Sequence, residues 1–211
     1  MEPAEQIAEA REREDGAGGS GSLNSTAAII IALMAMLLAI TSLGGGNAAE
    51  DIMNYNIRAS DTWAFYQAKN IRQTAYRLAA DDLESELGMQ TDALAPEARQ
   101  AVEARVRQYR ETAARYEDEP DKEAPSDPLR GEGKKQLTAR ARDFESQRDR
   151  AQAQDPNFDF AEALFQIAIV LASVAILASS RRILWGSVGV GAGAALLMLN
   201  GYFLLLPNLF S

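Results

Sequence analysis

Long apolar runs and polar stretches alternate along this chain. Apolar residues fill 27–43, 161–179 and 183–206, and the 117 residues between the first two runs are mostly polar. A hydrocarbon core about 30 Å thick is crossed by roughly 20 apolar helical residues. The pattern therefore predicts three transmembrane helices, which we place at 23–43, 158–179 and 183–206.

Proline and glycine divide the polar stretch after the first span into helical segments. We expect helices at about 48–87, 96–117 and 134–154 within an extramembrane domain that covers residues 44–157. Gly44–Gly46 would break the first span from the long helix that follows. A coiled-coil seam is indicated on the second of these helices by 4-3 spacing. Its positions are Val102, Val106, Tyr109, Ala113 and Tyr116.

No part of this stretch alternates for long with a period of two, so the sequence predicts an all-α membrane protein. The helix lengths favour a long helical hairpin or coiled coil whose return leg is broken into two helices. The loop at 117–133 is long enough to permit a compact three-helix arrangement as the alternative.

The boundaries of the first and second spans carry further signals. Residues 1–22 predict a short helix, Pro3–Glu14, followed by a flexible linker rich in Gly and Ser. This start is acidic, unlike a cleavable secretory signal, so we interpret the first span as a retained signal-anchor. Before the second span, Asp155 and Pro156 predict an N-cap and the first residue of a new helix.

Basic residues indicate which side of the membrane each segment occupies. Arg181 and Arg182 lie in the short loop between the second and third spans, and short cytoplasmic loops are enriched in Lys and Arg. We therefore expect a cytoplasmic N-terminus and an extracytoplasmic helical domain.

Composition removes several classes of function. The formal net charge of −9 argues against nucleic acid as the main partner, because a phosphate backbone requires a basic patch. The chain contains no Cys and no His, which removes thiolate chemistry and essentially removes zinc sites and the commonest general base. No phosphate-binding glycine loop is present, and no pair of side chains stands out as catalytic. We therefore expect no enzyme activity, no cofactor and no metal site, and we identify no small-molecule substrate.

Small residues line one face of each predicted span. Close approach of helix backbones through such residues drives helix association in lipid. The alternative is that Ala and Gly are simply common in the spans of an Ala-rich chain, and the spacing does not tell whether the partner helix belongs to the same copy. The positions are Ala28, Ala32, Ala35 and Ala39, then Ala168, Ala172 and Ala175, then Gly186, Gly189 and Gly193.

Two polar groups are further candidates. Asp159, Glu162 and Gln166 share a predicted face at the start of the second span, where an acid is often functional. The alternative is a position at headgroup depth, near a helix N-terminus that favours negative charge. On the long helix, aromatic and basic residues together form a candidate contact for a partner, although a contact between helices of the chain is the interpretation that we favour. These residues are Trp63, Tyr66 and Lys69.

Two sequence blocks carry a family resemblance. A W-A-x-Y-Q-A-K block matches Trp63, Ala64, Tyr66, Gln67, Ala68 and Lys69. An aromatic-D-x-A-E block matches Phe158, Asp159, Ala161 and Glu162. In both blocks, the chain resembles a bacterial family of three-span membrane proteins known only as a domain of unknown function. The resemblance implies a bacterial inner-membrane location, and it supplies no reaction, cofactor or catalytic residue.

These observations favour a non-enzymatic structural or accessory membrane protein. We expect it to assemble as a homo-oligomer, or else as a subunit of a larger membrane complex. A transport or channel component that uses the polar face of the second span is an alternative function, and a membrane sensor is another.

Overall fold

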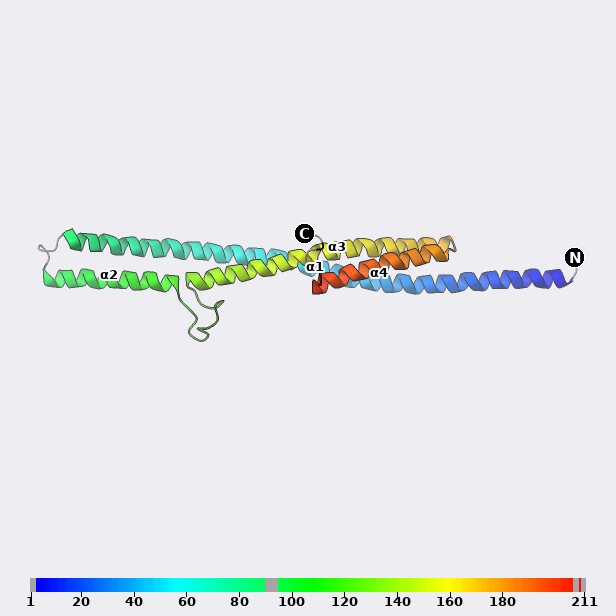
Figure 1. Cartoon of the computed structure of the whole chain (residues 1–211), viewed down its shortest axis with the longest axis horizontal. Coiled ribbons are helices and arrows are strands. Elements are labelled where there is room, and N and C mark those ends of the chain that lie inside the picture. Colours follow the sequence, from blue (N-terminus) through cyan, green and yellow to red (C-terminus); the bar gives the residue numbers. More distant parts are fainter. Residues whose placement is uncertain (1–2, 90–94, 207–208, 210–211) are drawn as a thin grey trace. The chain divides into compact units, whose positions relative to one another are not determined.

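The computed structural model describes the backbone of residues 3–89, 95–206 and 209, and the side chains of these residues from 23 onward. Over this part of the chain the structure contains four helices and no strand, which confirms the predicted all-helical class. The helices are α1 (Pro3–Met89), α2 (Pro96–Glu117), α3 (Lys134–Leu177) and α4 (Arg181–Phe203) (Figure 1).

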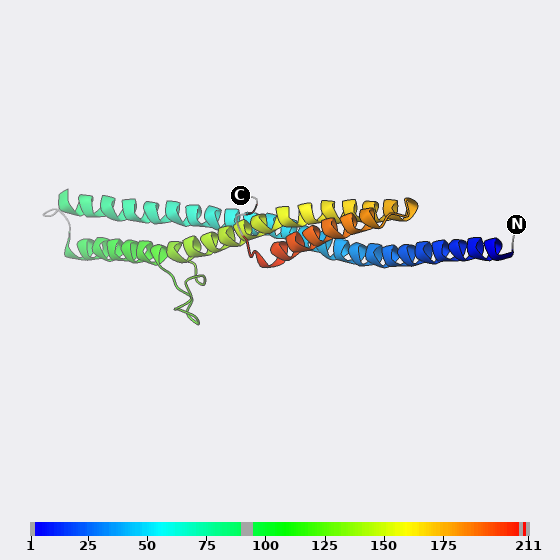
Figure 2. The same cartoon turned by 45° about the vertical axis from the view of Figure 1, so that its right-hand side comes forward.

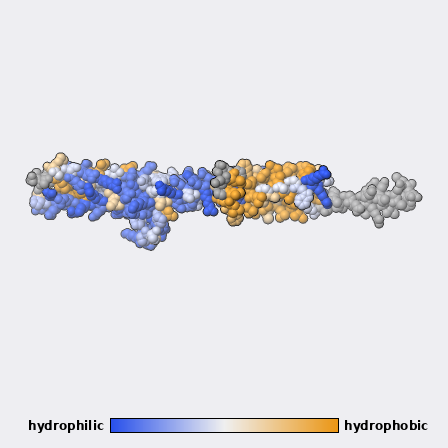
Figure 3. All heavy atoms as spheres, in the orientation of Figure 1, coloured by the Kyte–Doolittle hydropathy of each residue, from blue (hydrophilic) through white to orange (hydrophobic). Residues whose placement is uncertain are grey.

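The chain divides into two compact units, which we call the apolar unit and the polar unit. The apolar unit comprises residues 1–51 and 150–211, and the polar unit comprises residues 52–149. Hydrophobic side chains gather over α4 and the C-terminal part of α3, both in the apolar unit (Figure 3). Among the described residues, three helical stretches are long and apolar enough to cross a membrane: Leu23–Met89, Lys134–Leu177 and Arg181–Phe203.

Helix α1 continues where the sequence predicted interruptions. It includes Gly44–Gly46, predicted as a break, and residues 16–22, predicted as a flexible linker. The structure contradicts both predictions. A glycine costs a helix only about 1 kcal/mol relative to alanine, and no proline lies between residues 4 and 95 to remove a backbone donor.

Helix α3 also continues through a predicted boundary. Pro156 lies inside the helix rather than at the start of a new one, so the predicted N-cap at Asp155 is wrong. Proline removes one backbone N–H from the helix. The side-chain amide of the next residue, Asn157, donates to the carbonyl of Ala153 at 2.8 Å. The flanking side chains of Ala151 and Phe158 are both buried, so packing holds the helix together on either side of the proline.

Other boundaries agree with the sequence. Helix α2 begins at Pro96 and ends at Glu117 as predicted, with Pro96 in the first turn, where its missing N–H costs nothing. Helix α3 begins at the predicted Lys134. The turn into α4 contains Ser179 with a positive φ of 48°.

In the polar unit, α2 and the first part of α3 pack against α1. Figure 1 and Figure 2 both show α1 and α2 side by side. The ring of Tyr76 on α1 lies 5.5 Å from that of Tyr109 and 5.9 Å from that of Tyr116, both on the predicted seam of α2. Nearer the N-terminus of α1, the ring of Tyr55 lies 6.3 Å from the ring of Phe144 on α3. Aromatic contacts therefore join all three helices.

Candidate functional site

The side chain of Phe158 on α3 occupies a socket in the apolar unit. It is buried, and its ring packs edge-to-face on Tyr202 of α4 with centroids 4.9 Å apart. A Cβ atom placed on Gly44 of α1 would lie 2.6 Å from the Phe158 ring, and one on Gly201 of α4 would lie 2.8 Å away. Only glycine at these two positions leaves room for the ring between the helices.

Tyr202 and two asparagines add polar links around this socket. The Tyr202 hydroxyl donates to the carbonyl of Ile40 on α1 at 2.9 Å. The amide of Asn200 donates to the side-chain oxygen of Asn157 at 2.8 Å, and both asparagines are buried. The oxygen of Asn200 also accepts the N–H of Leu206 at 2.8 Å. A satisfied polar contact in an apolar interior specifies which residues meet, so these bonds fix the register of α3 against α4.

The predicted small-residue face of α3 is the face that packs within the chain. Ala168, Ala172 and Ala175 have no exposed surface. The hydroxyl of Ser187 on α4 donates to the carbonyl of Ala168 at 2.7 Å. This short contact between a side chain and the opposite backbone shows how closely the two helices approach.

The predicted glycine face of α4 does not pack against the part of the chain that the structure describes. A Cβ atom on Gly186, Gly189 or Gly193 would meet no atom within 4 Å. Close packing occurs instead at Gly191, where a Cβ atom would lie 2.5 Å from the terminal methyl of Met34. The packed face of α4 therefore lies beside the predicted one.

The predicted small-residue face of α1 points away from the other helices of the apolar unit. The residues of α1 that pack inward are Ala27, Met34 and Thr41, all buried. The four predicted residues are all exposed: Ala28, Ala32, Ala35 and Ala39. In the apolar unit, α1 thus presents a row of small side chains that no described helix covers.

In the polar unit, α1 also presents an apolar row outward. Ile57, Ala64, Ile71 and Leu78 follow one another at intervals of seven residues and are all exposed, with Ile71 70% exposed. We call these four residues the heptad row. Residues seven apart on a helix lie within about 20° of one another around its axis. The buried positions of α1 lie on the opposite side: Ala59, Thr62, Lys69, Gln73 and Ala80.

The three predicted partner-contact residues contact other parts of the polar unit. The indole N–H of Trp63 donates to Glu145 on α3 at 2.9 Å. Tyr66 lies beneath the ammonium of Lys134, which is 5.4 Å from its ring centroid. Lys69 is 3% exposed and forms an ion pair with Glu119 at 3.2 Å. The W-A-x-Y-Q-A-K block therefore joins α1 to α3 and to the loop that precedes α3.

A second buried lysine, Lys134, lies in the same part of the polar unit. We call the paired side chains around the two lysines the polar cluster: Lys69, Gln73, Glu117, Glu119 and Lys134. Lys134 donates to the side-chain oxygen of Gln73 at 2.8 Å and to Glu117 at 3.2 Å. The amide of Gln73 donates to Glu117 and to the carbonyl of Ala113. The bond from Gln73, and then the bond and charge of Lys134, lower the pKa of Glu117 below its ordinary value. Each group is paired, so the cluster is suited to holding helices in register.

The side chains of the predicted polar face of α3 are exposed or only half-buried. Asp159 and Gln166 are exposed, and Glu162 is half-buried. The amide of Gln166 donates to Glu162 at 3.3 Å, one helical turn away. Among the described residues, no group of three acidic side chains is placed to hold a metal ion.

One family model matches most of the chain. It is the model for the domain of unknown function DUF4337, and it matches residues 23–204. The chain belongs to the DUF4337 family. The family resemblance inferred from the two sequence blocks is thereby confirmed. The DUF4337 match contains the Phe158 socket, the polar cluster and the outward rows of α1. No curated protein and no solved structure shows significant similarity to the chain.

Sequence reasoning missed several contacts of this DUF4337 chain. It identified Phe158 within a block but did not connect it to Gly44 and Gly201. The available signal was a glycine triplet at the end of one apolar run and a glycine near the end of another. Asn200 was a second signal, because an amide in an otherwise apolar span requires a hydrogen-bond partner.

Proposed function

We propose that this protein is a non-enzymatic membrane scaffold that assembles with copies of itself along α1. Three apolar spans, at 23–43, 158–179 and 183–206, would hold it in the bilayer. The observation that carries the proposal concerns the side of α1 that faces away from the other helices of its unit. This side carries a row of apolar or small side chains in each unit, and no described segment of the chain covers either row.

In the apolar unit the exposed alanines support helix pairing in lipid. Lipid provides little hydrophobic drive for association, so exposed Leu or Ile alone would not favour a partner helix over acyl chains. Ala28, Ala32, Ala35 and Ala39 allow a second backbone to approach closely. Copies inserted in one membrane share the same orientation, so two α1 helices that meet there run parallel.

In the polar unit the heptad row supports the same pairing. An apolar residue at every seventh position supplies one of the two apolar positions of a left-handed coiled coil, and in a parallel coiled coil identical positions of two chains meet. Exposed Ile57, Ile71 and Leu78 would otherwise remain in contact with water, at a cost of about 1.5–3 kcal/mol per large side chain relative to full burial. We place this unit outside the membrane as a long helical hairpin or coiled coil.

The location of the scaffold is part of the proposal. The family resemblance supports the bacterial inner membrane, and Arg181 with Arg182 supports a cytoplasmic turn between α3 and α4. The polar unit would then lie on the extracytoplasmic side. Incorporation into a larger complex with other proteins is the second form that this assembly could take.

Native mass spectrometry of the full-length protein in mild detergent tests the proposal. We expect wild-type protein to contain two or more copies. Replacing Ala32 and Ala35 together with leucine should shift the population to fewer copies, because the larger side chains separate the backbones. The control is Ala163→Leu, at an exposed alanine of α3. Strictly monomeric wild type, or an equal shift in the control, would overturn the proposal.

A further inference from the structure

An apolar groove lies between α1 and α4 at the surface of the apolar unit. Its volume is about 220 Å³. Its walls are mostly apolar side chains, with Thr26 of α1 and an arginine from the first turn of α4 as the polar members. The lining residues include Leu23, Ile30, Arg181, Leu184, Trp185 and Val188.

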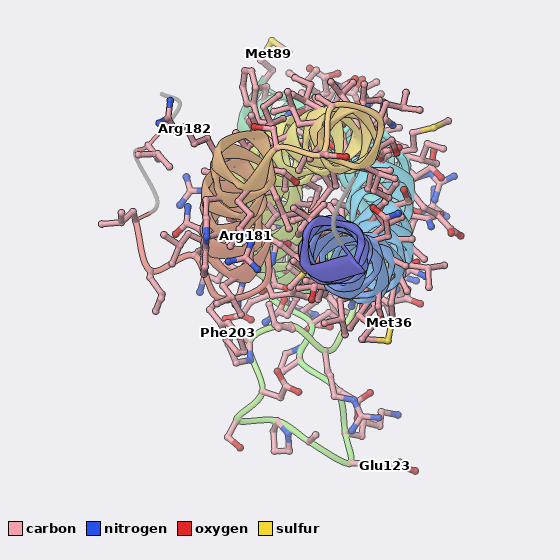
Figure 4. The ribbon with its side chains drawn as sticks, turned by 90° about the vertical axis from the view of Figure 1, so that its right-hand side faces the viewer. Met36, Met89, Glu123, Arg181, Arg182 and Phe203 are labelled. Carbon is pink, nitrogen blue, oxygen red and sulfur yellow. The ribbon has the colours of Figure 1, made fainter. Side chains whose placement is uncertain are left out.

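The two arginines at the start of α4 differ in their relation to this groove. Arg181 lines it, whereas Arg182 does not and lies farther from α1 in Figure 4. Both arginines are exposed, and neither forms an ion pair with a described side chain. The groove therefore combines a cation that has no ion-pair partner among the described side chains with an apolar surface directly beside it.

This combination matches one class of membrane component. An arginine guanidinium donates paired hydrogen bonds to a phosphate. Basic pockets between membrane helices bind anionic headgroups. Trp185 is 72% exposed beside Arg181, and tryptophan is enriched at headgroup level. Drug-sized sites usually measure about 300–1,000 Å³, so this groove fits part of one acyl chain rather than a whole lipid.

We propose that the groove binds one anionic glycerophospholipid. Its phosphate would contact Arg181, and one acyl chain would lie against Leu184, Val188 and Ile30. The inference rests on the membrane embedding in the proposed function, but it does not depend on self-assembly.

The test is lipid retention by the full-length protein, measured by native mass spectrometry with phosphatidylglycerol or phosphatidylcholine. Wild type should retain phosphatidylglycerol in preference to phosphatidylcholine. Arg181→Gln should reduce this preference about fivefold, the effect expected for one basic residue at a membrane surface. The matched control is Arg182→Gln, which removes the same charge one residue away but outside the groove, and it should reduce the preference less than Arg181→Gln does.

A second variant tests the groove without changing its charge. Val188→Phe fills the groove and should lower phosphatidylglycerol retention while Arg181 remains in place. An equal loss of the phosphatidylglycerol preference in Arg181→Gln and Arg182→Gln would overturn the proposal, because it would indicate binding by diffuse surface charge rather than at the groove. Equal retention of the two lipids by wild type, or full retention by Val188→Phe, would also overturn it.

The same spectra separate this inference from the scaffold. Monomers that retain phosphatidylglycerol would contradict self-assembly and support the lipid site. Oligomers without a lipid preference would contradict the lipid site alone.

Discussion

At the scale of single residues, glycine determines how closely the helices of the apolar unit approach. Gly44 and Gly201 face the Phe158 ring so closely that neither can carry a side chain without movement. Gly46, two residues from Gly44, has no atom near its missing Cβ. Three neighbouring glycines are alike in the sequence, and only the position of Phe158 distinguishes them. A single sequence could therefore not reveal which of them packs.

Gly44→Ala should destabilise the protein, whereas Gly46→Ala should not. The added methyl of Gly44→Ala would meet the Phe158 ring and the Tyr202 hydroxyl. Overpacking of this kind costs about 1–3 kcal/mol, while Gly46→Ala gains the higher helix propensity of alanine. Thermal unfolding followed by circular dichroism in detergent measures both variants. Equal midpoints for the two would contradict the packing of Phe158 on Gly44.

The polar cluster should make stability depend on pH. The pKa of Glu117 is lowered in the folded protein, first by Gln73 and then by Lys134. Ionised Glu117 therefore stabilises the fold above its ordinary pKa of 4.5, and this contribution is lost as pH falls through the lowered pKa. Asp118, bonded to Lys135, shifts in the same direction.

We expect the unfolding midpoint to fall as the solution is acidified below pH 4.5. Glu117→Gln should show a shallower fall, because one of the groups that take up protons has been removed. Thermal unfolding over a pH series measures both slopes. A variant slope as steep as that of wild type would contradict the role of Glu117.

At the scale of helices, the sequence predicted most elements but not their continuity. The bounds of α2 follow from Pro96 and from the charged, proline-rich loop that begins after Glu117. Local signals at Gly44–Gly46 and Pro156 predicted interruptions, yet α1 and α3 continue through both. Packing overrides local propensity at these points, and the packing partners lie far away in sequence. The small-residue faces show the same limit, because spacing identifies a face but not the helix that covers it.

Pro156→Ala distinguishes a continuous α3 from two separate helices. In a continuous helix the substitution restores a backbone donor and removes a ring clash, so it should stabilise the protein by up to about 3 kcal/mol. Pro96→Ala is the control, because Pro96 occupies the first turn of α2, where the missing N–H has no helical acceptor. Thermal unfolding measures both. An equally small effect of the two substitutions would indicate that a new helix begins at Pro156.

At the scale of the whole molecule, each of the two units has one side of α1 packed on other helices and another side exposed. One side packs on α3 and α4 in the apolar unit, and on α2 and α3 in the polar unit. The other side carries exposed alanines in the first and the heptad row in the second. Assembly of copies along α1 would bury this second side. The chain contains no cysteine, so a single introduced cysteine reports only its own contacts.

Disulfide formation between single-cysteine copies in native membranes tests the central claim directly. A disulfide requires Cβ atoms about 3.5–4.5 Å apart, so it forms only where identical residues of two copies meet. Cysteine at position 57, 64, 71 or 78 should give cross-linked dimers, whereas cysteine at the exposed flanking positions Asn70 and Arg72 should not. Equal cross-linking at positions 70, 71 and 72, or none along the heptad row, would contradict assembly along α1.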